Sequence, residues 1–139
     1  MRIIAIDYGD AHTGVAVSDP TGFLTGDVTT IHSRKAEVVL EELVKLVQTY
    51  QVDELVMGFP RNMDGTEGPR AELYRTFAGR VEEATGLKPV LWDERRTTIE
   101  AHNILSAGGK KMKQHRKNVD AVAASLILEG YLRFLGTGF

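Results

Sequence analysis

The chain has 139 residues, of which 42% are hydrophobic and 26% charged, and its formal net charge is −2. This length and composition predict one globular domain over residues 1–139 and exclude the disordered and fibrous classes. Cysteine is absent, which excludes disulfide bridges and thiolate zinc sites. There is no apolar run of about 18 residues, the length a membrane span needs, and a strand pattern follows Met1-Arg2 directly, so we expect a cytoplasmic protein that does not contact a membrane.

Strand patterns open the chain. Residues 2–8 form an apolar run with β-branched content, the turn-forming stretch GDAHTG follows, and residues 15–18 predict a returning strand. A third strand is predicted within residues 23–31. Apolar residues then recur with helical spacing over residues 35–50, which predicts an amphipathic helix.

Strands and helices alternate in the middle of the chain. Residues 53–59 and 89–93 predict two further strands. Between them, Pro69 suits the first turn of a helix, and Gly86 suits the position after its end. The apolar face of this helix is predicted to comprise Leu73, Phe77 and Val81.

Two helices are predicted after the last strand. Thr97 and Glu100 have the spacing of a capping box, which predicts a short helix ending at Gly108-Gly109. Asn118 is the predicted N-cap of a last helix that continues to Leu135. The order β-β-β-α-β-α-β-α-α predicts an α/β fold, with a mixed five-stranded sheet and helices on both faces.

Three acidic residues fall where this topology brings distant segments together. Asp7 ends the first strand, Glu94 follows the fifth, and Asp120 lies in the first predicted turn of the last helix. Three carboxylates within a few ångströms repel one another unless a cation is bound. Mg²⁺ and Mn²⁺ prefer such oxygen ligands, and two such ions support phosphodiester hydrolysis. We therefore expect these acids to be catalytic metal ligands.

Each acid also has a simpler structural explanation. Asp7 lies close to Gly9 and suits a turn, whereas Asp120 is electrostatically favoured near a helix N-terminus without any function. Glu94 is followed by Arg95 and Arg96, with which it can form salt bridges. The convergence of all three acids at one edge of the sheet is what favours a metal site.

A cationic segment precedes the last predicted helix. It reads GGKKMKQHRK over residues 108–117 and contains no acid. Such a segment is either a solvated loop or a binding site for phosphate groups. We expect this loop to contact a nucleic-acid backbone through Lys110, Lys111, Lys113, Arg116 and Lys117.

Four stretches of the sequence resemble the motifs of the YqgF family. They are AIDYGDAHTGVAVSD (5–19), GFPRNMDGTEGPRAE (58–72), PVLWDERRTT (89–98) and NVDAVAASLILEGYL (118–132). This family comprises bacterial RNase H-like proteins described as nucleases of pre-16S rRNA and as Holliday junction resolvase homologues. The resemblance implies an RNase H-like fold and metal-dependent hydrolysis of precursor rRNA or branched DNA. Ribosomal particles are further expected partners, and the chain is expected to be a monomer or a homodimer.

The resemblance maps the family's acids onto Asp7, Glu94 and Asp120. Asp93 also matches the motif, but adjacent strand residues point to opposite faces, so only one of the pair should face the metal ions. We choose Glu94. The chain departs from the family at Ala11-His12, where a basic pair is common. Other RNase H-like resolvases also carry an acid where this chain has Gly58-Phe59-Pro60.

The sequence leaves the roles of several supporting residues, and two other functions, open. Arg95 can bind the scissile phosphate or brace Glu94. A loop beside the site either holds substrate or is a plain loop; its candidate residues are Asn62, Asp64, Gly65 and Thr66. The histidines show no ligand spacing, so no zinc site is predicted. Two further hypotheses are an ATP-handling module, because DYGDAHTG resembles the phosphate hairpin of actin-like and sugar-kinase ATPases, and a non-catalytic RNA-binding assembly factor.

Overall fold

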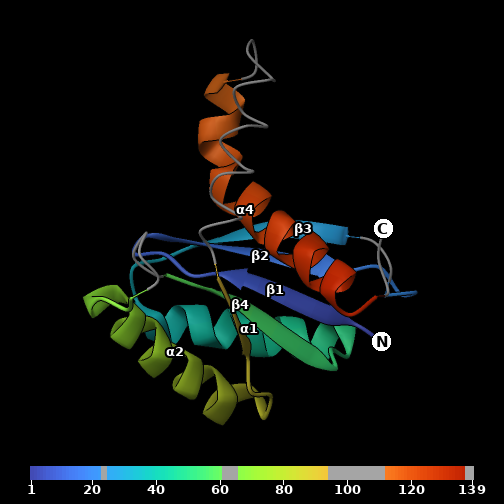
Figure 1. The fold of residues 1–139 in the computed structure, drawn as a ribbon, viewed down its shortest axis with the longest axis horizontal. Coiled ribbons are helices and arrows are strands. Elements are labelled where there is room, and N and C mark those ends of the chain that lie inside the picture. The colour runs from blue at the N-terminus through green and yellow to red at the C-terminus, as the bar shows by residue number, and fades with distance from the viewer. Residues whose placement is uncertain (23–24, 61–65, 94–111, 137–139) are drawn as a thin grey trace.

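The computed structural model describes residues 1–22, 25–60, 66–93 and 112–136, of which 112–121 are described by their backbone alone. Within these residues the chain forms a five-stranded sheet with the strand order β3-β2-β1-β4-β5 (Figure 1). The strands are β1 (Ile3–Asp7), β2 (His12–Ser18), β3 (Thr25–His32), β4 (Glu54–Phe59) and β5 (Val90–Asp93). The predicted sheet is confirmed, although β2 is longer than expected at its start.

Strand direction places several chain segments at one end of the sheet. β2 is antiparallel to both β1 and β3, whereas β1, β4 and β5 are mutually parallel. The carboxyl ends of β1, β4 and β5 therefore lie at the same edge as the start of β2 and the end of β3. We call this edge the Asp7 edge, after the last residue of β1. A Cβ on Gly9, in the turn at this edge, would overlap the His12 carbonyl oxygen, so the tight hairpin requires glycine there.

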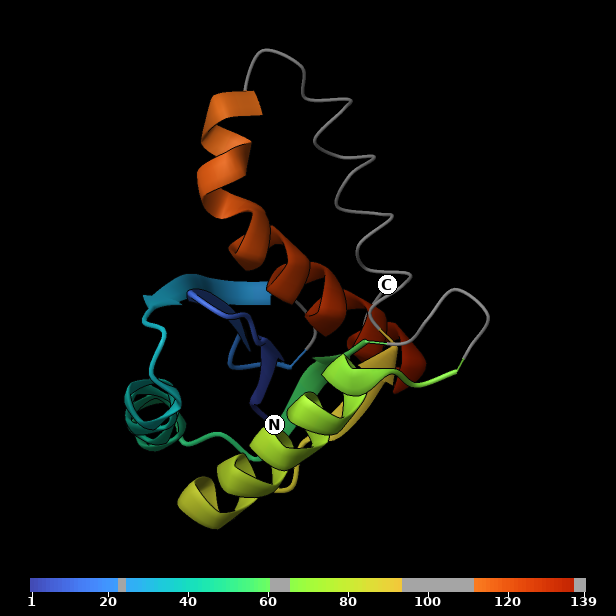
Figure 2. The same cartoon turned by 90° about the vertical axis from the view of Figure 1, so that its left-hand side faces the viewer.

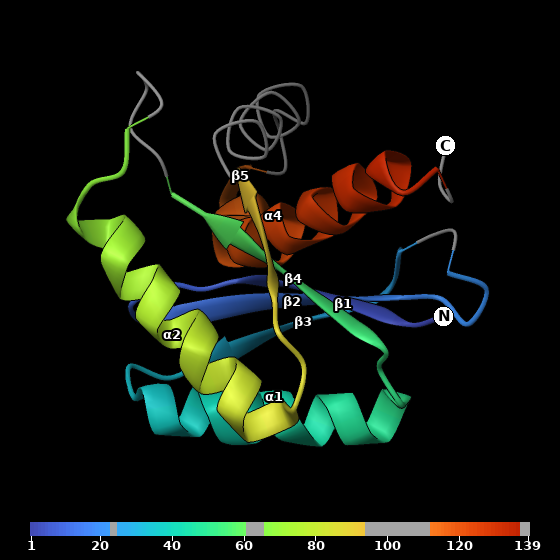
Figure 3. The same ribbon diagram turned by 60° about the horizontal axis from the view of Figure 1, so that its bottom comes forward.

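Helices cover both faces of the sheet. α1 (Ala36–Tyr50) and α2 (Pro69–Thr85) pack on one face, which we call the α1/α2 face, and α4 (Met112–Phe134) crosses the other, the α4 face (Figures 1 and 3). Strand residues alternate between the two faces, as a pleated strand requires. Ile4 and Ile6 of β1 join the core on the α1/α2 face, whereas Ile3 and Ala5 join the core on the α4 face.

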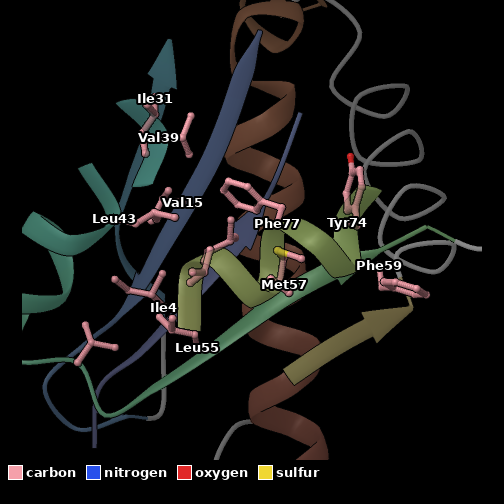
Figure 4. Packing of buried hydrophobic residues seen from close by; sticks show 14 of the residues in the cluster. Ile4, Val15, Ile31, Val39, Leu43, Leu55, Met57, Phe59, Tyr74 and Phe77 are labelled. Atoms are coloured by element: carbon pink, nitrogen blue, oxygen red, sulfur yellow. The ribbon is translucent and has the colours of Figure 1, made fainter. Parts of the chain in front are cut away.

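The core on the α1/α2 face includes side chains from β1, β2, β4 and both helices (Figure 4). Pro69 occupies the first turn of α2, and Gly86 follows its end with a φ of 80°, both as predicted. The buried residues of this helix are Ala71, Tyr74, Phe77, Ala78 and Val81. Leu73 is 49% exposed, so its predicted place on the apolar face is wrong. The sequence pattern missed this because small alanines and a tyrosine, rather than a leucine, occupy the buried side.

The last helix begins earlier than predicted. α4 starts at Met112, so Asn118 is not its N-cap and Asp120 does not lie in its first turn. The stretch MKQHRK has strong helix formers and no glycine or proline, and this propensity outweighs repulsion between its like charges. The early turns of α4 extend beyond the sheet (Figures 1 and 2).

The carboxyl half of α4 packs closely on the sheet. Ala124 is fully buried in a cluster with Ala5 and Ala16, so small side chains on both elements permit the close approach. At the far end of α4, the Tyr131 hydroxyl donates a hydrogen bond to Glu54 at the start of β4. Burial and this carboxylate raise the pKa of Tyr131 to about 12. None of the helices among the described residues is long and apolar enough to cross a membrane.

Candidate active site

Asp7 is the acidic end of an otherwise apolar central strand. The four residues before it, Ile3 to Ile6, are fully buried, whereas Asp7 is half-buried. Strand alternation puts Asp7 on the α4 face together with Ile3 and Ala5. A carboxylate is thus held on the middle strand of the sheet, at the edge where the loops leave.

Asp7 has glycine beside it on both neighbouring strands. Gly14 of β2 is its antiparallel partner. On the other side Ile6 pairs with Met57 of β4, so Gly58 follows at the level of Asp7. Neither glycine carries a side chain that would cover the carboxylate from the adjacent strand. Asp7 is therefore flanked on both adjacent strands by residues that bring no side chain to the α4 face.

The end of β5 distinguishes the two adjacent acids Asp93 and Glu94. Leu91 packs against the core on the α1/α2 face, and Trp92 packs against the core on the α4 face. Asp93, the next residue, therefore lies on the α1/α2 face, opposite to the face that carries Asp7. Glu94 is outside the described residues, so the choice of Glu94 over Asp93 as a partner for Asp7 stays a prediction.

An aromatic group from α2 holds the backbone that follows Asp7. The ring of Tyr8 stacks on Phe77 with centroids 3.8 Å apart and an interplanar angle of 7°. The Tyr74 hydroxyl donates a hydrogen bond to the Tyr8 carbonyl oxygen, and Arg70 donates to the same hydroxyl at 2.8 Å. Burial, and secondarily Asp10, raises the pKa of Tyr8. Sequence reasoning missed this support because Tyr8 and Tyr74 are distant in sequence, and the predicted apolar face of this helix contained Leu73 rather than Tyr74.

Known proteins resemble this chain in sequence over nearly its whole length. The sequence profile of the RuvX family, described as "Holliday junction resolvase", matches residues 1–134. A relative from Carboxydothermus hydrogenoformans, named "Putative pre-16S rRNA nuclease", is 43% identical over 134 residues, which are 96% of this chain and 97% of that protein. The chain belongs to the RuvX family. The family resemblance seen in the sequence motifs is thereby confirmed.

Solved structures share the fold of this RuvX-family chain at low sequence identity. The Holliday junction resolvase of Fowlpox virus matches with a TM-score of 0.62 and 13% identity, covering 97% of this chain and 99% of that one. Thermus thermophilus RuvC in complex with a Holliday junction substrate matches with a TM-score of 0.58 and 11% identity, covering 99% and 97%. These matches confirm the predicted RNase H-like fold.

The other predicted site residues of the RuvX-family chain fall into two groups. One group lies outside the described residues and consists of Asn62, Asp64, Gly65, Glu94, Arg95, Lys110 and Lys111. The other group has a described backbone: Thr66 is exposed just before α2, and Lys113, Arg116, Lys117 and Asp120 belong to α4. Prediction of a basic loop is therefore wrong for residues 112–117, which are helical.

A metal site needs ligands from more than one of these segments. Among the residues with described side chains, no group of three histidines, aspartates or glutamates is close enough to hold an ion. Asp7 is the one member of the predicted carboxylate triad whose side chain is described. A site shared by Asp7, Glu94 and Asp120 thus stays a prediction.

Proposed function

We propose that this chain is a metal-dependent nuclease that hydrolyses phosphodiester bonds of precursor 16S rRNA, and that residues 1–139 form a single RNase H-like domain. The observation that carries the proposal is Asp7, half-buried at the end of the central strand with Gly14 and Gly58 beside it. The names of the curated relatives support the choice of substrate.

The residues at this edge suit Mg²⁺ or Mn²⁺. Carboxylate oxygens are the ligands that these ions prefer, and the residues beside Asp7 on both neighbouring strands are glycines, which have no side chain. Glu94 is the residue directly after β5. In the pairing of β4 with β5, Gly58 lies opposite Trp92, two residues before Glu94. Asp120 precedes the buried Ala124 by four residues, about one helical turn, on the part of α4 nearer the Asp7 edge. The proposal requires both carboxylates to face Asp7.

The chemistry follows from this ligand set. Divalent ions bound here would supply an activated water molecule and positive charge at the leaving oxygen. Asp7, Glu94 and Asp120 would hold them. Arg95 binds the scissile phosphate through its paired N–H groups. The lysines and arginines around the start of α4 contact the backbone of the nucleic acid, which gives affinity that falls as salt rises.

A cleavage assay tests this function. The full chain is incubated with precursor 16S rRNA and, separately, with a four-way DNA junction, in Mg²⁺, in Mn²⁺ and with a chelator. We expect cleavage of the RNA in either metal and none with chelator. Cleavage of the junction alone would instead favour the resolvase function that the family description names. Salt-sensitive RNA binding without cleavage in any metal would reject the nuclease and favour an assembly factor.

The Tyr74 contact provides a smaller prediction. Tyr74→Phe removes the hydrogen bond to the Tyr8 carbonyl but keeps the ring, so we expect a loss of about 1 kcal/mol in the free energy of unfolding. The melting temperature should fall by about 3 °C. If the contact also positions Asp7, kcat falls several-fold while KM is unchanged.

Tyr50→Phe is a matched control for this variant. The Tyr50 hydroxyl donates a hydrogen bond of 2.7 Å to Asp27 on the exposed surface. This control should leave kcat unchanged. Equal kcat values for Tyr74→Phe and the parent protein would show that Tyr74 contributes to stability only.

A further inference from the structure

We propose that His12 and His32 form a two-histidine binding site for a divalent transition-metal ion, separate from the carboxylate site. The two residues are 20 positions apart in sequence but are directly paired across β2 and β3. Their Nδ1 atoms lie 2.9 Å apart, and their ring centroids are 5.0 Å apart at an interplanar angle of 80°. Both side chains are exposed, so an ion can reach them from solvent.

The separation of the Nδ1 atoms suits two ligands of one ion. Metal–imidazole bonds are about 2.0–2.1 Å long, so adjacent ligands at right angles lie about 2.9 Å apart and tetrahedral ligands about 3.3 Å apart. The observed 2.9 Å matches the separation of two such ligands, and rotation of the two exposed rings would turn both Nδ1 lone pairs from each other toward one ion. Because β2 and β3 are hydrogen-bonded strands, the backbone already holds the two rings on one side of the sheet, and binding costs little ordering of the chain.

The hydrogen bond between the rings is a weak competitor for a metal ion. One ring must donate and the other accept, since neutral imidazole has one donor and one acceptor nitrogen. On an exposed surface, water can replace either partner, so this bond contributes little. A metal ion instead uses the lone pairs of both Nδ1 atoms at once.

The ligand type selects the ion. Imidazole suits Cu²⁺, Ni²⁺ and Zn²⁺, whereas Mg²⁺ and Mn²⁺ prefer oxygen. Among the residues with described side chains, no third histidine or acid completes the set. Water molecules can fill the remaining coordination positions, and affinity should follow the general order in which Cu²⁺ binds more tightly than Ni²⁺ or Zn²⁺.

The position of the pair suggests what a bound ion would do. His12 lies on the strand beside β1, two residues from Gly14, the partner of Asp7. Strand spacing and rise place its Cα roughly 8 Å from that of Asp7, and alternation puts both residues on the α4 face. An ion there would add positive charge close to the Asp7 edge, and it would attract a phosphate group. This last step rests on the proposed nuclease function, but ion binding itself does not.

Calorimetric titration with Zn²⁺ and with Ni²⁺, without nucleic acid, tests the site. We expect the full chain to bind one ion at this pair, and His12→Gln or His32→Gln to weaken that binding by more than about tenfold, the least that losing even an outer-shell partner costs. His102→Gln and His115→Gln are matched controls and should bind as the parent does. Equal binding by the parent and by a His12→Gln/His32→Gln double variant would overturn the proposal.

A second measurement needs no variant. In an amide NMR spectrum of the parent chain, paramagnetic Ni²⁺ or Cu²⁺ should broaden the signals of the start of β2 and the end of β3 first. Broadening that begins elsewhere would reject the site even if a variant failed to fold. Since neither experiment includes RNA, the metal site and the nuclease function fail or succeed independently.

Discussion

Replacing Asp7 with asparagine is expected to reduce metal-dependent RNA cleavage by about a thousandfold or more. Such a factor corresponds to about 4 kcal/mol of transition-state stabilisation, which is within the range that bound metal ions supply. Asparagine keeps the size of the side chain but removes the charge that attracts the cation. The rate of cleavage at saturating RNA, in Mg²⁺ and in Mn²⁺, is the measurement.

The fold should survive this change. Asp7 is half-buried, and the four apolar residues before it provide the packing of β1. In the proposed cluster with Glu94 and Asp120, loss of one charge relieves repulsion in the absence of metal, so we expect the variant still to unfold in one cooperative transition. The parent chain should be stabilised by Mn²⁺ and the variant should not.

Asp10→Asn is a matched control for this variant. Asp10 lies in the same hairpin but is exposed, and we expect unchanged cleavage. Cleavage by Asp7→Asn at the parental rate would reject the proposed metal site.

The architecture was predictable because its signals are local. Apolar runs, the proline at the start of α2 and the glycine after its end each fix the conformation of a few neighbouring residues. The start of α4 was misplaced because two local signals conflict there. Asn118 is a good N-cap, but the six residues from Met112 are good helix formers, and the helix begins with them.

Contacts between distant segments were predictable only in part. Parallel strands end at one edge, so the place of Asp7 follows from topology alone. The pairing of His12 with His32 depends on the register between β2 and β3, and β3 has a weak pattern with mostly exposed side chains. The contact of Tyr74 with the Tyr8 carbonyl depends on how α2 lies across the sheet. The spacing of residues along the chain predicts neither the histidine pair nor the Tyr74 contact.

The adjacent acids Asp93 and Glu94 provide the second large prediction. Glu94→Gln should reduce cleavage by about a thousandfold, as at Asp7, whereas Asp93→Asn should change it by less than about tenfold. The reason is the pleat of β5, in which Leu91 and Trp92 contact opposite cores and so fix the face of the residue that follows. Both changes remove one charge and keep the shape, which makes each variant the control for the other.

Cleavage rates and the rise in melting temperature on adding Mn²⁺ should be measured for both variants. Loss of both properties in Glu94→Gln alone would mean that the side-chain alternation of β5 continues past its last described residue, Asp93. The opposite result, with Asp93→Asn inactive and Glu94→Gln active, would require Asp93 to act from the α1/α2 face. That face carries the aromatic support under Tyr8 rather than the row of Gly14, Asp7 and Gly58. Such a result would reject a shared site for Asp7 and Glu94 even if the chain is a nuclease.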